Sequence, residues 1–315
     1  MKKVLITGAN GFIGQYLVEE FLKDYKVYCL LRPGTTNLKR LEPFKDKIQI
    51  IFHDIREPAE YLAEKLKNIN IILHAAGNPS AEDSINDPLK VIYDNVIGTT
   101  NLLNLSRKLN LDRFVYYAAG ETFGPVAPNV DSLETDPYNS VSPYAASKAA
   151  GEEICVSYFH TFRIPVSIIH ITNTFGEKLQ SNRFPVIAIK KILNNEILKI
   201  HIGNNGLISG RRWLHAQEVA LQTRFILNHQ KTQCEKWNSA GIRFLTNLEF
   251  ASLISSSLDT TLNYEFVKNN KVGNEPIFSL SPSKLITQGW TESINIEDRI
   301  KSVVNWYRNN PNWLI

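Results

Sequence analysis

Cysteine is scarce in this chain of 315 residues. The three that occur, Cys29, Cys155 and Cys234, share no metal-ligand spacing and cannot all pair with one another. Neither a metal site nor a disulfide framework is therefore expected. Such scarcity is typical of proteins in a reducing compartment, and the sequence predicts a cytoplasmic location.

Long apolar runs are missing as well. No uninterrupted apolar stretch is long enough to cross a bilayer. The apolar segment after the basic residues 2–3 is interrupted by glycines, which argues against a signal peptide. Basic residues form no long runs and the net charge is only +4, so neither a membrane nor nucleic acid is expected as a partner. What remains, 43% apolar and 21% charged residues, is the composition of an ordinary globular protein.

Strand and helix signals alternate from the start of the chain, which predicts an α/β fold, a doubly wound parallel sheet with helices on both faces. Later the alternation loosens, and we expect a smaller α/β lobe that interleaves with the sheet domain. The predicted boundaries are 1–172 plus about 212–240 for the sheet domain, and 173–211 with 241–315 for the lobe. Strands are expected at 3–6, 26–31, 48–52, 69–73, 114–117 and 166–171, and helices at about 88–109, 144–158, 185–193 and 296–309.

The stretch Thr7–Gly14 lies between the first expected strand and a helical pattern, and it has glycines at three-residue intervals. This arrangement is typical of the first crossover of a dinucleotide-binding sheet. Gly8 permits the tight turn, Gly11 lets a pyrophosphate approach the backbone, and Gly14 lets the helix pack closely on the strand. The free N–H groups at the start of that helix would bind the phosphates. The residues expected at the cofactor here are Gly8, Asn10, Gly11, Phe12, Ile13 and Gly14.

Tyr144 and Lys148 stand four residues apart, one helical turn, on the same face of an expected helix. The spacing alone is weak evidence, since Tyr61 and Lys65 repeat it, but small residues around the first pair would let this helix lie close to another surface. A phenol has a pKa of about 10, so acting as a base near neutrality needs a shift of roughly 3 units, about 4 kcal/mol. A buried lysine and a positive nicotinamide ring could together supply that shift. The alternative is an exposed tyrosine beside a solvated lysine.

Six stretches occur together in this chain: Thr7–Gly14, His74–Ala76, Asp87–Pro88, Asn95–Thr99, Tyr144–Lys148 and Arg211–His215. Because these stretches follow one another in this order and at these intervals, the chain resembles the extended short-chain dehydrogenases/reductases of the nucleotide-sugar epimerase/dehydratase type over nearly its whole length. The resemblance implies a Rossmann domain, a small substrate lobe, a nicotinamide cofactor and a nucleotide-sugar substrate. It also implies a homodimer built on the helices expected near 88–109 and 144–158.

The resemblance implies roles for single residues of the sheet domain. Asp54 and Ile55 would flank the adenine of the cofactor, and Ala75 and Ala76 would line its channel. Asn95 would be the structural asparagine of the active site, beside the catalytic Tyr144 and Lys148, which would also contact the cofactor.

In the lobe, the resemblance implies that Asn173 and Arg211 hold the diphosphate of the substrate. The planar fork of an arginine binds phosphate oxygens in pairs, which suits that role. The alternative for Arg211 is one surface charge among 35 lysines and arginines. Arg183 is a further candidate for contact with the substrate.

The loop after the fifth strand departs from the family pattern. The family places Ser or Thr where this chain has Ala119, so the hydroxyl that would hydrogen-bond the reacting sugar is missing. Such a bond to a developing charge is worth roughly 1.5–3 kcal/mol, so Thr122, a water or the substrate itself substitutes for it, or the reaction differs. Glu121 lies where sugar 4,6-dehydratases and decarboxylases carry a glutamate, which in the dehydratases removes the proton next to a transient 4-ketone. The alternative for Glu121 is a solvated loop carboxylate.

The end of the second strand departs from the pattern for NAD. An acidic residue there would bind the ribose hydroxyls of NAD, whereas this chain has Arg32, which suits the 2′-phosphate of NADP. Lys39 or Arg40 could add to that site. The sequence therefore favours NADP, with NAD possible; alternatively, Arg32 only caps an exposed turn before Pro33.

Three functions remain open on this evidence. The first is an NAD(P)-dependent enzyme that modifies a nucleotide-linked sugar through a transient 4-keto intermediate, as a dehydratase or epimerase. The second is an NADPH-dependent reductase of a keto-sugar or other carbonyl compound, which Arg32 favours. The third is a non-catalytic nucleotide sensor, to which the loss at Ala119 points and against which Tyr144, Lys148 and Asn95 argue.

Overall fold

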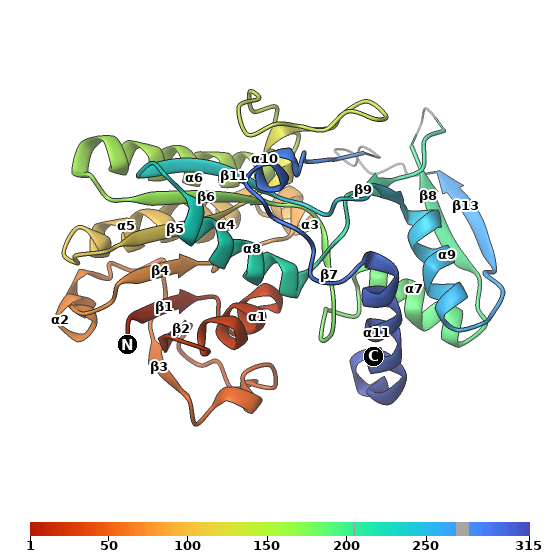
Figure 1. Cartoon of the computed structure of the whole chain (residues 1–315), viewed down its shortest axis with the longest axis horizontal. Helices are drawn as coiled ribbons and strands as arrows, with labels where there is room; N and C mark the ends of the chain where they lie inside the picture. The colour runs from red at the N-terminus through yellow and green to blue at the C-terminus, as the bar shows by residue number, and fades with distance from the viewer. Residues whose placement is uncertain (204–205, 269–276) are drawn as a thin grey trace. The chain divides into compact units, whose positions relative to one another are not determined.

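The computed structural model describes residues 1–203, 206–268 and 277–315 and divides into two compact units (Figure 1). No helix among those described residues has both the length and the apolar character needed to span a membrane. Unit 1 comprises Met1–Gly124, Glu134–Ile171 and Val219–Trp237, and unit 2 comprises Pro125–Leu133, Thr172–Glu218 and Asn238–Ile315. The chain therefore passes from one unit to the other several times.

Unit 1 is built on a seven-stranded sheet with the strand order β11-β6-β5-β4-β1-β2-β3. Every pair from β3 to β6 is parallel, so the carboxyl ends of these strands meet at one edge (Figure 1). The order reverses between β1 and β4, and ligands of open α/β sheets bind outside the carboxyl ends of strands at such a point. The predicted doubly wound α/β fold is confirmed. The strands are β1 (Lys3–Thr7), β2 (Lys26–Leu31), β3 (Ile48–Phe52), β4 (Ile71–His74), β5 (Arg113–Ala119), β6 (Val166–Ile171) and β11 (Cys234–Ser239).

Helices cover both faces of this sheet, as two neighbouring tyrosines of β5 demonstrate. Adjacent side chains of a strand point to opposite faces. The Tyr116 hydroxyl donates to the Lys148 carbonyl of α6 at 3.0 Å, whereas the Tyr117 hydroxyl lies 3.0 Å from Thr223 Oγ1 of α8. The helices of this part of the chain are α1 (Phe12–Phe21), α2 (Ala63–Leu66), α3 (Ala81–Asn86), α4 (Pro88–Ile92), α5 (Gly98–Ser106), α6 (Pro143–Phe162) and α8 (Ala216–His229), with short 3₁₀ turns η1 (Glu42–Phe44), η2 (Glu60–Leu62) and η4 (Gly120–Phe123).

The run predicted as one helix at 88–109 is interrupted. Between α4 and α5 lies a π-helical turn, η3 (Tyr93–Ile97). A π turn inserts one residue into the helical repeat and occurs frequently at functional sites. Here it accompanies the burial of Asp94 and Asn95, which are 5% and 1% exposed. The prediction of a single α-helix is wrong at this turn, because apolar periodicity does not encode an inserted residue.

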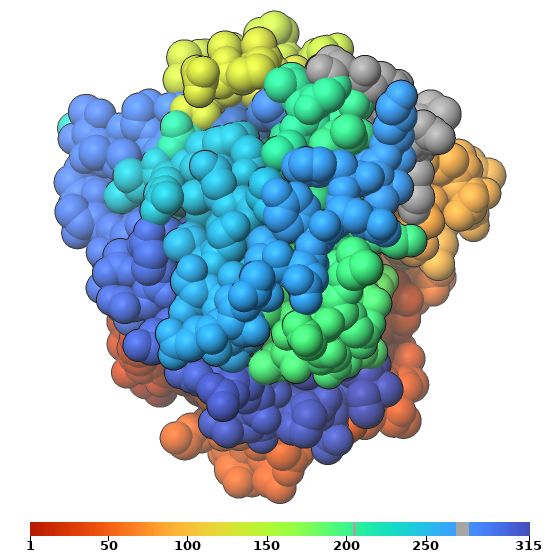
Figure 2. Space-filling model, turned by 90° about the vertical axis from the view of Figure 1, so that its right-hand side faces the viewer, coloured from red at the N-terminus to blue at the C-terminus, as the bar shows by residue number. Residues whose placement is uncertain are grey.

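Unit 2 is made of short elements around an aromatic core. The Phe250 ring lies 4.8 Å from the Trp213 ring and 5.2 Å from the Phe175 ring, between centroids. Figure 2 faces the surface where α9 and β13 (blue) lie beside α7 (green). The elements are β7 (Thr174–Phe175), α7 (Phe184–Leu193), β8 (Leu198–Ile202), β9 (Gly210–Arg211), β10 (Leu214–His215), β12 (Leu245–Thr246), α9 (Asn247–Ser257), β13 (Tyr264–Lys268), α10 (Ser283–Thr287), α11 (Ile296–Asn309) and η5 (Pro311–Trp313).

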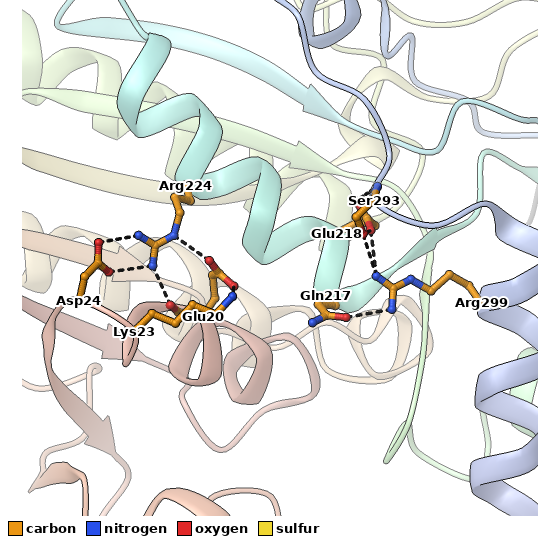
Figure 3. Close-up of polar contacts among 8 residues, drawn as sticks. All are labelled: Glu20, Lys23, Asp24, Gln217, Glu218, Arg224, Ser293 and Arg299. Carbon is orange, nitrogen blue, oxygen red and sulfur yellow. Dashed lines mark hydrogen bonds and ion pairs between the residues drawn. The ribbon is translucent and has the colours of Figure 1, made fainter.

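Two arginines each bind carboxylates within their own unit (Figure 3). In unit 1, Arg224 of α8 donates to Glu20 at 2.7 Å and to Asp24 at 2.7 Å and 2.8 Å, near the end of α1. In unit 2, Arg299 of α11 donates to Glu218 at 3.0 Å. Glu20 and Glu218 are 4% and 2% exposed. A carboxylate buried to that extent without a partner would be costly, so these contacts secure the packing of the helices.

Candidate active site

The glycine-rich turn after β1 is a cradle that only glycine backbone fits. Gly8 has a φ of +67°, and a Cβ on it would lie 2.7 Å from the Ala76 nitrogen. A Cβ on Gly14 would lie 2.1 Å from the Gly8 carbonyl oxygen, so glycine is what lets α1 begin this close to the strand. Gly11 caps α1 without a side-chain cap, and the first turn has no acidic residue. The cradle and this helix start fit the pyrophosphate of a dinucleotide.

Asn10 connects this cradle to the loop after β2. Its Nδ2 donates to the Asn37 carbonyl at 2.7 Å. Its Oδ1 is buried and has no hydrogen-bond partner among the described residues, which a bound ligand could supply. Phe12 is buried and Ile13 half-buried at the start of α1. The residues predicted to contact the phosphates thus lie together in the turn after β1 and the first turn of α1.

A chain of buried hydrogen bonds joins the cradle to η3. The Ala76 N–H donates to Thr7 Oγ1 at 3.1 Å, and that hydroxyl lies 2.8 Å from His74 Nδ1. His74 Nε2 lies 2.9 Å from Thr99 Oγ1, which donates to the Asn95 carbonyl at 2.6 Å. Because the Thr99 proton is used on that carbonyl, Nε2 of His74 carries the ring proton and Nδ1 accepts from Thr7. Burial lowers the pKa of His74 to about 3, which keeps the ring neutral.

The Asn95 side chain fastens the loop after β4 to the first turns of α6. Its Oδ1 accepts from the Asn78 N–H at 2.7 Å, and its Nδ2 donates to the Asn78 carbonyl at 3.1 Å and to Ser147 Oγ at 2.9 Å. Ser147 in turn donates to the Tyr144 carbonyl at 2.7 Å. A Cβ on Gly77 would lie 2.5 Å from the Asn95 amide oxygen, so glycine leaves room for this contact. Asn95 therefore holds backbone in place around Tyr144.

Lys148 is buried against an aromatic ring of the sheet. It is 8% exposed, and its Nζ lies 4.3 Å from the centroid of the Tyr116 ring. A Cβ on Gly151 would lie 2.4 Å from the Tyr116 hydroxyl, so glycine lets α6 approach β5. Burial lowers the pKa of Lys148 to about 8. Because helical side chains lean toward the N-terminus, Lys148 extends toward the turn that carries Tyr144.

Tyr144 is the second residue of α6, at a well-capped helix start. Ser142 is the N-cap and accepts from the Ala145 N–H at 3.1 Å, and Pro143 occupies the first helical position. Tyr144 is half-buried. The positive end of a helix dipole lies at this turn, where a phenolate would be favoured.

The loop after β5 forms η4, and it engages the Thr122 hydroxyl internally. Thr122 is fully buried, and its hydroxyl donates to the Ala119 carbonyl at 2.8 Å. Ala119 ends β5 and is 3% exposed. Glu121 is half-buried on the same turn. Thr122 is therefore not available as a hydrogen-bond donor in place of the hydroxyl that the sequence lacks at Ala119, since its proton is already donated.

Arg32 lies among carboxylates at the ends of β2 and β3. Its Nη2 is 3.5 Å from Asp94 Oδ1, and its Nε is 3.8 Å from Asp54 Oδ2. Asp54 also accepts from Arg56 at 2.6 Å, and these bonds to Arg56 lower the pKa of Asp54 to about 2. Ile55 is 7% exposed beside them. The positive charges of the two arginines are thus neutralised by Asp54 and Asp94, at the place where the ribose of a dinucleotide would lie.

Unit 2 brings two of its three predicted substrate residues together. Arg211 Nε donates to Asn173 Oδ1 at 3.0 Å, and the Arg211 guanidinium lies 4.9 Å from the centroid of the Phe278 ring. Arg183 is exposed at the N-cap of α7. The residues predicted in the sheet domain, by contrast, all lie in unit 1.

Sequence reasoning gave no role to four residues of this site, His74, Thr99, Ser147 and Tyr116, although the first three lie within the stretches that carry the resemblance. Each is at least 97% buried and connects two elements. A histidine at the end of an apolar strand was the available signal, because buried polar groups need partners. Among the described residues, no group of histidine, cysteine and carboxylate side chains could hold a metal ion.

The chain has recognisable relatives across its full length. A model of the NAD-dependent epimerase/dehydratase family matches residues 4–240. The dTDP-D-glucose 4,6-dehydratase of Mus musculus is 27% identical over 329 residues, which cover 99% of this chain and 90% of that protein.

Solved structures share the fold. DesIV, a dTDP-glucose 4,6-dehydratase from Streptomyces venezuelae with NAD and TYD bound, has a TM-score of 0.88 at 24% identity and covers 99% of this chain and 98% of its own. The UDP-glucuronic acid 4-epimerase from Bacillus cereus, with UDP-glucuronic acid and NAD, has a TM-score of 0.87 at 22% identity and covers 98% and 99%.

Burial of Lys148 predicts a pH-dependent cost of folding. The unfolded chain keeps the ordinary pKa near 10.5 while the folded one has about 8, so the unfolded state binds more protons between these values and stability rises with pH across this window. Lys148→Met removes that cost. We expect the cofactor-free variant to gain up to about 3 kcal/mol at pH 7, and the gain to shrink toward pH 10. Urea unfolding at both pH values measures it.

The matched control is Lys301→Met, at an exposed lysine of α11. We expect no change with pH in its difference from the wild type. If the gain in unfolding free energy of Lys148→Met is the same at pH 7 and pH 10, the lowered pKa of Lys148 is not what destabilises the folded wild type.

Proposed function

Because this chain belongs to the NAD-dependent epimerase/dehydratase family, we propose that it modifies a nucleotide-linked sugar through a transient 4-keto intermediate, as a dehydratase or an epimerase. Membership confirms the resemblance carried by the sequence motifs and makes the chain an enzyme. The names of its relatives, dTDP-glucose dehydratases and a UDP-glucuronic acid epimerase, support the substrate class. The observation that carries the proposal is the buried Lys148 one turn from Tyr144, with Asn95 and the glycine cradle in the same unit.

In this proposal, Tyr144 accepts the proton of the sugar C4 hydroxyl. A nicotinamide dinucleotide held by the glycine cradle would supply the hydride acceptor for that oxidation and the hydride donor that regenerates the oxidised cofactor. The Lys148 cation would favour the phenolate of Tyr144 and would hold the nicotinamide ribose of the cofactor. Asn95 keeps the turn that carries Tyr144 in place through Ser147. Asn173 and Arg211 bind the diphosphate of the substrate, with Arg183 as a further contact.

Glu121 decides between the two reactions. Once a 4-ketone exists, the proton on the neighbouring carbon is acidic, and a carboxylate can remove it. Glu121 is the single ionisable side chain of η4. Dehydration needs that base. Epimerisation at C4 needs only Tyr144 and a 4-keto sugar that rotates in the site, so that the hydride returns to its opposite face.

The test offers dTDP-glucose and UDP-glucose to the enzyme and follows products by chromatography. We expect turnover without net loss of reduced cofactor, and a fall of roughly 10²–10⁴-fold in Tyr144→Phe. Tyr61→Phe is the matched control, because Tyr61 has the same spacing to a lysine but is 70% exposed. Glu121→Gln should abolish a dehydration and spare an epimerisation.

Other outcomes assign another function. One reduced cofactor consumed per turnover identifies the carbonyl reductase. Cofactor binding without turnover of any sugar, unaffected by Tyr144→Phe, identifies the nucleotide sensor.

The cofactor is NAD in this proposal. Both solved relatives named above contain NAD. Arg32, from which the sequence favoured NADP, already faces Asp54 and Asp94, so a 2′-phosphate would share it with two carboxylates. The negative charges of these carboxylates would repel the 2′-phosphate of NADP. The uncharged 2′-hydroxyl of NAD would meet no such repulsion.

Calorimetric titration of the cofactor-free enzyme tests this choice. We expect the wild type to bind NAD more tightly than NADP. Asp94→Asn removes one carboxylate beside Arg32 and should improve NADP binding roughly three- to tenfold, with NAD binding within about twofold. Adding Arg32→Leu should cancel the gain. A wild type that prefers NADP, and loses that preference in Arg32→Leu, would establish Arg32 as the 2′-phosphate ligand instead.

The enzyme is a homodimer in this proposal. Leu89, Ile92, Tyr93 and Ile97 recur at helical spacing along α4 and η3, and they are 64%, 42%, 55% and 38% exposed. An exposed apolar stripe of this kind marks a surface that a partner covers. A second copy of the same chain would cover it symmetrically.

Sedimentation velocity tests the dimer. We expect a dimer for the wild type at micromolar concentration, and a monomer for Leu89→Lys combined with Ile92→Lys, because two charges would be buried in the contact. Ile197→Lys, at a residue 57% exposed in unit 2, is the control and should leave the dimer intact. A monomeric wild type would rule the dimer out.

A further inference from the structure

A buried carboxylate that the reaction does not use lies on the same helix as Tyr144. Glu152 of α6 is fully buried. It faces His170 Nε2 of β6 at 2.8 Å and Lys236 Nζ of β11 at 2.9 Å, and it accepts from the Tyr138 hydroxyl. Four separate parts of unit 1 therefore meet at one side chain.

This cluster also contacts the loop that carries Glu121. The Phe123 ring of η4 packs on both aromatic members of the cluster, 4.7 Å from the His170 ring and 6.0 Å from the Tyr138 ring. The residue after Tyr138 continues the contact, because the Asn139 N–H donates to the Thr122 carbonyl at 3.0 Å. Both the Tyr138 ring and the backbone that follows it are thereby joined to η4.

The segment that follows leads directly into the catalytic helix. Residues 139–142 connect Tyr138 to the start of α6, and Ser140 Oγ donates to the Thr122 carbonyl at 3.3 Å. Glu152 lies two turns after Tyr144 on the same helix. The bond that Tyr138 donates to Glu152 therefore closes a ring of contacts that contains Tyr144 and to which the turn with Glu121 is attached.

A charge at this place is costly and needs a reason beyond packing. Burial alone would raise the pKa of Glu152, but its bonds to His170 and Tyr138 and the charge of Lys236 hold it at about 2. A buried ion pair usually stabilises a fold no better than well-packed apolar side chains do. What directed bonds add is geometry, since three donors fix the carboxylate against three elements at once.

We propose that Glu152 is a positioning residue, whose bond to Tyr138 sets the placement of the Glu121 loop relative to Tyr144. This inference rests on the proposed function, because that function gives Glu121 and Tyr144 their roles. The two side chains must reach neighbouring carbons of one sugar ring. A displacement of about 1 Å between catalytic groups can cost roughly a hundredfold in rate.

The chain contains a matched control one residue away. Glu153 approaches the same partners, 3.2 Å from the Tyr138 hydroxyl and 3.9 Å from Lys236 Nζ, but its side chain is 59% exposed. It has the same charge and lies on the same helix. If only charge near Tyr138 matters, Glu152→Gln and Glu153→Gln will behave alike.

The experiment compares Glu152→Gln, Tyr138→Phe and Glu153→Gln in the full-length enzyme. We expect kcat per cofactor-binding site to fall roughly 10- to 100-fold in the first two, with KM for the nucleotide sugar within about twofold. Glu153→Gln should stay within about twofold of the wild type. Tyr138→Phe keeps the ring against Phe123 and so tests the bond even if Glu152→Gln folds poorly.

Amide hydrogen exchange gives a readout that does not depend on activity. We expect faster exchange at residues 119–124 and 139–146 in Glu152→Gln and Tyr138→Phe, with exchange in α1 unchanged. A merely structural role would instead raise exchange throughout unit 1 and leave kcat per binding site unaltered, which would overturn the proposal. Wild-type exchange in η4 in both variants would overturn it too.

The two failures are distinguishable. If the proposed function is wrong, the wild type turns over no nucleotide sugar or Tyr144→Phe is fully active. If only the positioning role is wrong, the wild type is active and Tyr144→Phe inactive, while Glu152→Gln and Glu153→Gln match each other.

Discussion

The neutral imidazole of His74 is the interaction on which the site depends. It accepts from Thr7 beside the glycine cradle and donates to Thr99 in α5, which in turn donates to the Asn95 carbonyl, so its two nitrogens join the cradle to η3. The direction of each hydrogen bond in this series, from Ala76 to the Asn95 carbonyl, requires a single proton on the His74 ring. A second proton would place two donors against each other at Thr7, and a pKa of about 3 keeps that from occurring at ordinary pH. The cradle and the π turn are therefore held in one arrangement.

Helix α6 then carries two buried charges of opposite sign, Lys148 and Glu152, one turn apart. Glu152 meets three donors, whereas no carboxylate among the described residues lies within ion-pair distance of Lys148, which faces the ring of Tyr116. The cost of that burial appears as the lowered pKa of Lys148, which the charge of Glu152 offsets in part. Lys148 thus stays cationic at neutral pH but close to its titration point. A cation held in such a desolvated place attracts a neighbouring anion more strongly than an exposed lysine does.

The sheet could be predicted closely because its strands are short apolar runs between turns: the strands expected at 26–31 and 166–171 have those bounds as β2 and β6. The π turn could not, since one inserted residue leaves the apolar periodicity nearly unchanged. The engagement of the Thr122 hydroxyl was equally invisible, because a hydroxyl that faces its own loop looks like one that faces a ligand. Glu152 did leave a signal, an acidic residue on the small-residue face of α6 four positions after Lys148. Reading it required knowing that this face is buried on the sheet.

The energetics of Tyr144 indicate where the missing hydroxyl at Ala119 is felt. Ionising a phenol near neutrality needs about 4 kcal/mol. A nearby cation supplies roughly 1–3 pKa units and a helix N-terminus about 0.3–1 kcal/mol more. Tyr144 lies in the first turn of α6, and in the proposed mechanism Lys148 would supply the cation. These contributions approach the requirement without any hydroxyl from the loop after β5. The hydroxyl would instead orient the sugar, and Thr122 could not donate to the sugar while its proton is on the Ala119 carbonyl. In the proposed mechanism, the absence at Ala119 would therefore bear on how the substrate is held rather than on the ionisation of Tyr144.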